Sequence, residues 1–240
     1  MNDDARAMAL LLAGVTVGFL VHRGTYALYV KVGMQPALLA VAILLVVLGI
    51  AKLAEAKLAE ATLARPGPRT GPGRGPLAAW LLLVPVLAVG LVQPTPLGAW
   101  TASRQPTTVP ATPSSIFPPL ERGPDGVVKI TVSEFVWRAE SGDQGGLGGV
   151  PVRLVGMVAP AARGTGGFGL IRFTLSCCAA DARPQRVTIQ GLPTPPPADT
   201  WVEVTGRWQA AHEPSIGAFQ PPVLRTSQLR RIPRPTNPYE

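Results

Sequence analysis

The chain has little charge, few histidines and few cysteines for its length. Of its 240 residues only 15% are charged, whereas 47% are hydrophobic, and the mean hydropathy is +0.25. Its two cysteines are adjacent and cannot close a loop, and two histidines leave little for a zinc finger. Glycine and proline are abundant, at 26 and 27 residues. This composition excludes a disulfide-rich secreted domain and a fully disordered chain, and it favours a small membrane protein with a soluble part.

Three uncharged apolar runs lie in the first 92 residues, at 7–21, 32–51 and 77–92, and predict helices over about 6–22, 32–54 and 77–93. A helix needs roughly 20 apolar residues to cross a bilayer core. We therefore predict a membrane anchor over 1–92 with about three transmembrane helices. The first run does not look like a cleaved signal peptide, because the segment before it is acidic and His22 and Arg23 stand where small residues would mark cleavage.

Basic residues are unevenly divided between the loops of this anchor. The loop after the second run carries five cations, whereas the loop before it carries two: Lys52, Lys57, Arg65, Arg69 and Arg74 against Arg23 and Lys31. Loops rich in Lys and Arg stay in the cytoplasm. The sequence thus predicts a multi-pass protein of the cell membrane whose C-terminal part is extracytoplasmic.

The remainder of the chain divides into a linker, a strand-rich domain and a short tail. Residues 93–124 contain eight prolines and predict an extended linker. Short β-rich runs follow, and they alternate with Gly- and Pro-rich loops: 127–132, 151–159, 168–176, 186–190, 201–208 and 223–232. Over 125–232 they predict an all-β domain, an OB-like small antiparallel barrel, with an open sandwich as the alternative. Residues 233–240 are expected to form a flexible tail.

The most unusual chemical feature is the pair Cys177 and Cys178, followed by Asp181. Neighbouring side chains of a strand face opposite ways, so the two thiols converge only if the chain turns after the strand. Three interpretations stay open. The cysteines are two small apolar residues, one in the barrel core and one in a turn, or with Asp181 they bind a soft metal ion, or they form a redox pair. Arg172 and Arg183 flank the pair, and we expect both on an exposed face.

Other chemistry is not apparent in the sequence. The segment GPGRGP is broken by proline and GDQGGLGG is not followed by a helix, so neither predicts a nucleotide-binding loop. No spacing of Ser, His and acidic residues indicates a catalytic triad. We therefore expect no enzymatic activity. Since the residues from 125 onward are only mildly basic and lack a row of aromatic side chains, we also expect no nucleic-acid binding.

The segment RFTLSCCAADA, from Arg172 to Ala182, resembles the hallmark of the YcgQ-like permease-subunit family of bacterial membrane proteins. Further agreement comes from GTYALYV near the N-terminus, PTPLG after the last apolar run, and LVGMV and WVEVTG in the β-rich part. The resemblance implies a subunit that works beside a separate multi-span permease. Its CCxADA signature carries over only as positions: Arg172, Phe173, Cys177, Cys178, Ala180 and Asp181.

Together these observations predict an accessory membrane subunit of a permease. Its partners would be the lipid bilayer and a multi-span permease subunit, and its barrel would bind a small solute or a soft metal ion through the Cys pair. A membrane-tethered thiol redox protein and a purely structural docking module are the alternatives.

Overall fold

The computed structural model describes residues 3–62, 97–105, 117–141, 146–161, 165–210 and 220–240. These residues form two compact units, Met1–Thr95 and Pro96–Glu240. The predicted third span at 77–93 lies outside the described residues, as do residues 93–96 and 106–116 of the predicted linker. Each unit is described by itself.

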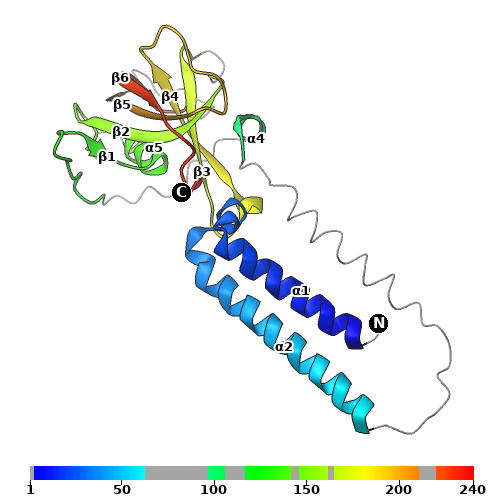
Figure 1. The fold of residues 1–240 in the computed structure, drawn as a ribbon. Helices are drawn as coiled ribbons and strands as arrows, with labels where there is room; N and C mark the ends of the chain where they lie inside the picture. The colour runs from blue at the N-terminus through cyan, green and yellow to red at the C-terminus, as the bar shows by residue number, and fades with distance from the viewer. Residues whose placement is uncertain (1–2, 63–96, 106–116, 142–145, 162–164, 211–219) are drawn as a thin grey trace. The chain divides into compact units, whose positions relative to one another are not determined.

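The first unit is a helical hairpin of α1 (Asp3–His22) and α2 (Gln35–Thr62), joined by the short 3-10 helices η1 (Thr25–Leu28) and η2 (Val32–Met34). The two long helices run side by side (Figure 1). Two glycines let their backbones approach. A Cβ on Gly14 would lie 2.9 Å from the Ala42 carbonyl oxygen, and one on Gly49 would lie 2.7 Å from the Leu11 side chain. Small residues at helix contacts are typical of membrane helix pairs.

The apolar segment Val32–Leu58 is long and hydrophobic enough to cross a membrane. Large apolar side chains on it remain exposed within the structure, among them Ile43, Leu44, Val47 and Ile50. A helix of this kind near the N-terminus is compatible with a membrane span and with a signal sequence. The apolar helix Arg6–His22 is shorter than this segment and lies at the lower end of the length range of membrane spans. The helix continues through the KLAEAKLAEA segment as expected, and Lys52 pairs with Glu55 at 2.7 Å.

The second unit contains a closed barrel of five strands (Figure 1). The strands are β2 (Pro151–Ala159), β3 (Phe168–Thr174), β4 (Arg183–Gln190), β5 (Trp201–Gln209) and β6 (Val223–Arg231). They follow the order β2-β3-β4-β6-β5, and β5 pairs again with β2. A small closed barrel is therefore confirmed. It is not purely antiparallel, because β4 and β6 run parallel.

Glycines allow the tight curvature that closure requires. A Cβ on Gly156 of β2 would lie 2.9 Å from the Ile171 carbonyl oxygen of β3, and the register of β5 against β6 shifts between Thr205 and Gly206. Gly206 thus marks an irregularity of the β5–β6 pairing, whereas Gly156 permits close contact between β2 and β3. Alternate apolar side chains of the strands fill the interior with Leu154, Leu170, Val187, Ile189, Val202, Val204 and Leu224, all essentially inaccessible to solvent.

A helix that precedes β2 in the sequence packs against the barrel core. The strand β1 (Val128–Lys129) pairs parallel with β2, and α5 (Val132–Glu140) follows it. Phe135 and Val136 of α5 are fully buried in the barrel core. Thr131 is the N-cap of α5, and its hydroxyl accepts the Glu134 N–H at 3.0 Å. The predicted strand over 127–132 is accordingly shorter.

Parts of the predicted linker and tail fold onto the barrel. The short helix α4 (Ala99–Arg104) buries Ala99 and Ala102, and Asp199 accepts the Ala99 N–H at 2.7 Å. At the other end of the chain, residues 233–240 are not a free tail: Tyr239 is 4% exposed and pairs with Phe173 of β3. Burial of the Tyr239 ring offsets the conformational entropy that this proline-rich segment loses on docking.

Candidate functional site

The Cys pair lies in the loop that joins β3 to β4. The strands pair up to Thr174 and Arg183, so residues 175–182 form the hairpin connection. Leu175 is buried and its N–H donates to the Glu240 carbonyl at 3.1 Å, which fixes the end of β3. The chain turns immediately afterwards, which is the condition under which two adjacent thiols can converge.

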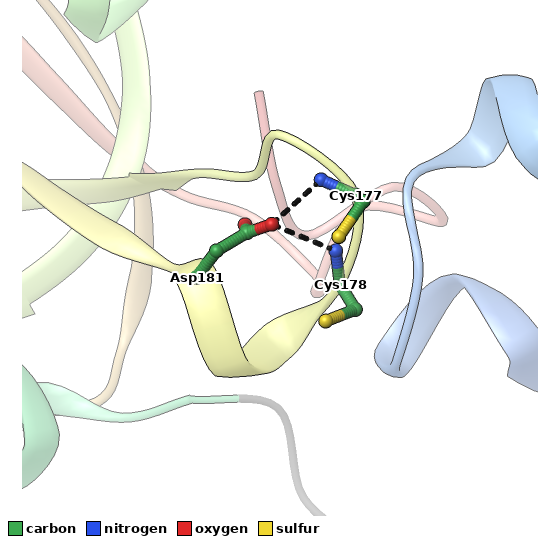
Figure 2. Close-up of side chains that lie close together, drawn as sticks. All are labelled: Cys177, Cys178 and Asp181. Atoms are coloured by element: carbon green, nitrogen blue, oxygen red, sulfur yellow. Dashed lines mark hydrogen bonds between the residues drawn. The ribbon is translucent and has the colours of Figure 1, made fainter.

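Asp181 organises this turn through its carboxylate. One oxygen accepts the Ser176 N–H at 2.9 Å, and the other accepts the N–H groups of Cys177 at 2.8 Å and Cys178 at 3.3 Å (Figure 2). Asp181 ends the 3-10 helix η4 (Ala179–Asp181), and the Cys178 side chain accepts the Asp181 N–H in return. This reciprocal arrangement is a capping box in which cysteine takes the usual place of serine or threonine.

The turn brings three potential metal ligands together. The two sulfur atoms and a carboxylate oxygen all lie within 4.8 Å of one another. Cys177 is exposed, and Cys178 and Asp181 are partly exposed. Neither cysteine forms a disulfide and neither is buried, so the interpretation that places one of them in the barrel core does not describe this loop. His212, the one histidine of this unit, lies outside the described residues.

The electrostatics of the loop follow from the Asp181 charge. A hydrogen bond from the Cys177 side chain, followed by the backbone N–H groups, holds the pKa of Asp181 well below its usual range. The same carboxylate, followed by the neighbouring Cys178 thiol, raises the pKa of Cys177 to about 11. A reactive thiol needs the opposite shift, towards the thiolate. The loop therefore holds a stable negative charge beside a protonated thiol.

The flanking arginines do not act on the thiols in the way an activating cation would. Arg183 is exposed, as expected. Arg172 is buried, contrary to expectation: its guanidinium lies over the Trp201 ring at 4.9 Å and donates to the Asn237 carbonyl at 2.7 Å. Long-range contacts with the C-terminal segment cause this burial, and a local sequence pattern does not report them.

The other residues that carried the resemblance, Phe173 and Ala180, lie outside the cluster of Cys177, Cys178 and Asp181. Phe173 is buried and its carbonyl accepts the Glu240 N–H at 2.8 Å, so with Arg172 it holds the C-terminal segment. Ala180 is an exposed residue of η4. Of the signature positions, Cys177, Cys178 and Asp181 form the cluster, and sequence reasoning identified these three because they are adjacent in the chain. It missed Glu240, which the fold brings beside Arg172.

Comparison with known proteins gives one match. Residues 151–240 match the family model of the DUF1980 C-terminal domain. The matched part begins with β2 and contains all five barrel strands, the hairpin loop and the C-terminal segment. No curated protein and no solved structure matches. The C-terminal part of the chain is thus similar to this domain, and the match names neither the YcgQ-like family nor its signature.

Proposed function

We propose that this chain is a membrane-anchored accessory protein whose barrel binds one thiophilic metal ion through Cys177, Cys178 and Asp181. The observation that carries the proposal is the convergence of two sulfur atoms and a carboxylate oxygen within 4.8 Å on an accessible loop. Thiolates bind soft and borderline ions such as Cu(I), Zn²⁺ and Cd²⁺ and discriminate against hard ions. A buried structural pair would not need this exposure.

The geometry of the loop is close to what such an ion needs. Two thiolates bound to Zn²⁺ at about 2.3 Å each lie at most about 4.6 Å apart. A spread of up to 4.8 Å therefore closes with small side-chain rotations. Because Asp181 also accepts three backbone N–H groups, it keeps the loop in shape before the ion arrives. Three ligands leave a coordination position for water or for a group from a partner, which suits reversible binding.

The anchor supports a role at a membrane. The segment Val32–Leu58 exposes large apolar side chains along its length, which a bilayer would cover. A membrane-associated accessory protein is compatible with this helix and with the match of the barrel to the DUF1980 C-terminal domain. The finer parts of the proposal rest on the sequence: three spans, an extracytoplasmic barrel, a multi-span permease as partner, and a binding role without catalysis.

Titration of the purified full-length chain in detergent with Cd²⁺ tests the metal site. We expect one ion to bind per chain and to produce the ultraviolet absorption of cadmium thiolates. The double variant Cys177→Ser/Cys178→Ser should lose both binding and absorption. Asp181→Asn should weaken binding by about tenfold or more, because it removes a charged ligand.

Glu121→Gln supplies the matched control, since Glu121 is an exposed carboxylate elsewhere on the same unit. This variant should bind Cd²⁺ as the parent chain does. Absence of stoichiometric binding, or binding that survives the double serine substitution, would overturn the metal site. Co-purification with a permease that persists in the double serine variant would then favour a structural docking module.

A further inference from the structure

The barrel unit also contains a pocket whose lining does not include Cys177, Cys178 or Asp181. It has a volume of about 460 Å³ and lies beside the N-terminus of α5. The residue before α5, strands β1 to β3 and the C-terminal segment all contribute to its wall. Residues that matter for its chemistry are Lys129, Thr131, Arg153, Arg172, Tyr239 and Glu240. A volume of this size suits a small organic molecule.

Arg172 carries an unusual hydrogen-bonding deficit at this pocket. The residue is only 9% exposed, and one terminal nitrogen donates to the Asn237 carbonyl. Its other two nitrogens, Nε and Nη1, have no hydrogen-bond acceptor among the described residues. A buried donor without an acceptor costs about 1–3 kcal/mol, and more when the group is charged. Such a group requires an explanation, and a bound ligand supplies one.

Glu240 does not remove this deficit. Its carboxylate lies 3.8 Å from Arg172 Nε, which is an ion pair but too long for a hydrogen bond. Its oxygens instead accept the N–H groups of Val132 and Ser133, each at 2.9 Å, and the Ser133 hydroxyl. The carboxylate thus caps α5, where the positive end of the helix dipole favours an anion.

Besides Arg172 and Glu240, the charged residues of the pocket wall are Lys129, Arg153 and Glu134. Glu134, the other acid in the wall, is bound by Arg138 at 2.8 Å. Arg153 pairs with Asp125 at 2.6 Å, and Lys129 is exposed. Ile130, Val155 and the Tyr239 ring supply an apolar surface between these groups. The wall therefore combines the buried guanidinium of Arg172, the exposed ammonium group of Lys129 and an apolar patch.

We propose that this pocket binds a small organic anion, whose carboxylate or phosphate group accepts hydrogen bonds from the Nε and Nη1 groups of Arg172. Both nitrogens are covered in this structure, so the side chains of the pocket wall shift when the anion enters. Guanidinium is the side chain best suited to oxyanions. The hydrocarbon part of the ligand would contact Ile130, Val155 and Tyr239. Lys129 attracts the anion to the pocket, whereas the Glu240 carboxylate opposes it. This site is independent of the metal site proposed above.

Binding assays on the full-length chain in detergent test this proposal. The probes are acetate, butyrate and inorganic phosphate, titrated at constant ionic strength against chloride while thermal stability and intrinsic fluorescence are followed. We expect saturable binding of at least one probe, with butyrate tighter than acetate if the apolar patch contributes. Phosphate that binds in preference to both carboxylates would assign the ligand as a phosphate compound.

Variants separate the pocket from general electrostatics. Lys129→Gln should weaken binding a few-fold, and Arg172→Lys by about tenfold or more. Glu240→Gln removes a competing charge and should tighten it. Arg183→Gln, an exposed cation at the start of β4, should have no effect. Since Lys129 is exposed, its substitution does not threaten folding, so the test remains decisive even if Arg172→Lys unfolds.

Three results would overturn the proposal: no probe saturates, Lys129→Gln leaves binding unchanged, or Arg183→Gln weakens binding equally. The double variant Cys177→Ser/Cys178→Ser should retain anion binding. This comparison shows which proposal fails, because the double variant removes the metal ligands and leaves the pocket residues unchanged.

Discussion

Single glycines allow close backbone contacts at the barrel strands, and Gly167 is the clearest case. It precedes β3 with a φ of 86°, a backbone conformation that residues with a Cβ rarely adopt. A Cβ there would lie 1.9 Å from the Ile189 carbonyl oxygen of β4. The neighbouring Gly166 is exposed, and a Cβ on it would meet no atom within 4 Å. The two adjacent glycines therefore have different structural requirements.

Substituting each glycine by alanine tests this difference. Gly167→Ala should destabilise the barrel by about 2 kcal/mol or more, because the strain and the clash cannot both relax. Gly166→Ala should be neutral or slightly stabilising, since it restricts the unfolded chain. Urea unfolding of the full-length chain in detergent, followed by tryptophan fluorescence, measures both. Equal losses in the two variants would contradict the assigned role of Gly167.

Contacts between elements hold the helical hairpin and the hairpin loop in place. In the first unit, α1 and α2 approach at Gly14 and Gly49, whereas a Cβ on Gly18 would meet no atom within 4 Å. In the second unit, the C-terminal segment fixes the end of β3 through the Leu175 N–H and the pairing of Phe173 with Tyr239. Close packing at a few positions thus determines the arrangement of whole elements.

The glycines of α1 give a test at this scale. Gly14→Leu should push the helices apart and cost about 1–3 kcal/mol, the usual range for overpacking. Gly18→Leu, one turn further along the same helix, should leave the pair intact. Thermal unfolding of the helical signal by circular dichroism in detergent distinguishes them. If Gly18→Leu lowers the thermal stability of the helices as much as Gly14→Leu does, the close approach of α1 and α2 at Gly14 is contradicted.

The whole molecule combines a candidate membrane segment with a barrel that carries an accessible thiol pair. The excess of Lys and Arg in the segment after the second apolar run predicts that the barrel faces outward. Cys177 and Cys178 are the only cysteines of the chain, and Cys177 is exposed. They therefore serve as natural reporters of the side on which the barrel lies.

Labelling of sealed spheroplasts with a membrane-impermeant maleimide tests this topology. The native pair should react before lysis. In the Cys177→Ser/Cys178→Ser background, Arg69→Cys should react only after lysis, because position 69 lies in the basic loop predicted to be cytoplasmic. The raised pKa of Cys177 slows its reaction, so both reactions are compared at one alkaline pH. Reaction of the native pair only after lysis would contradict an extracytoplasmic barrel.

The sequence by itself determined those features that depend on local pattern. Apolar runs and β-rich runs predicted α2 and the boundaries of β2 and β5 because helix and strand periodicities are local properties. The adjacency of Cys177, Cys178 and the nearby Asp181 predicted the metal candidate for the same reason. Only the tertiary structure decided the parallel β4–β6 pairing, the docking of the C-terminal segment and the burial of Arg172. Those features depend on contacts between residues far apart in the chain. The buried surface and hydrogen bonds that stabilise them form only in the folded barrel, so no local sequence pattern predicts them.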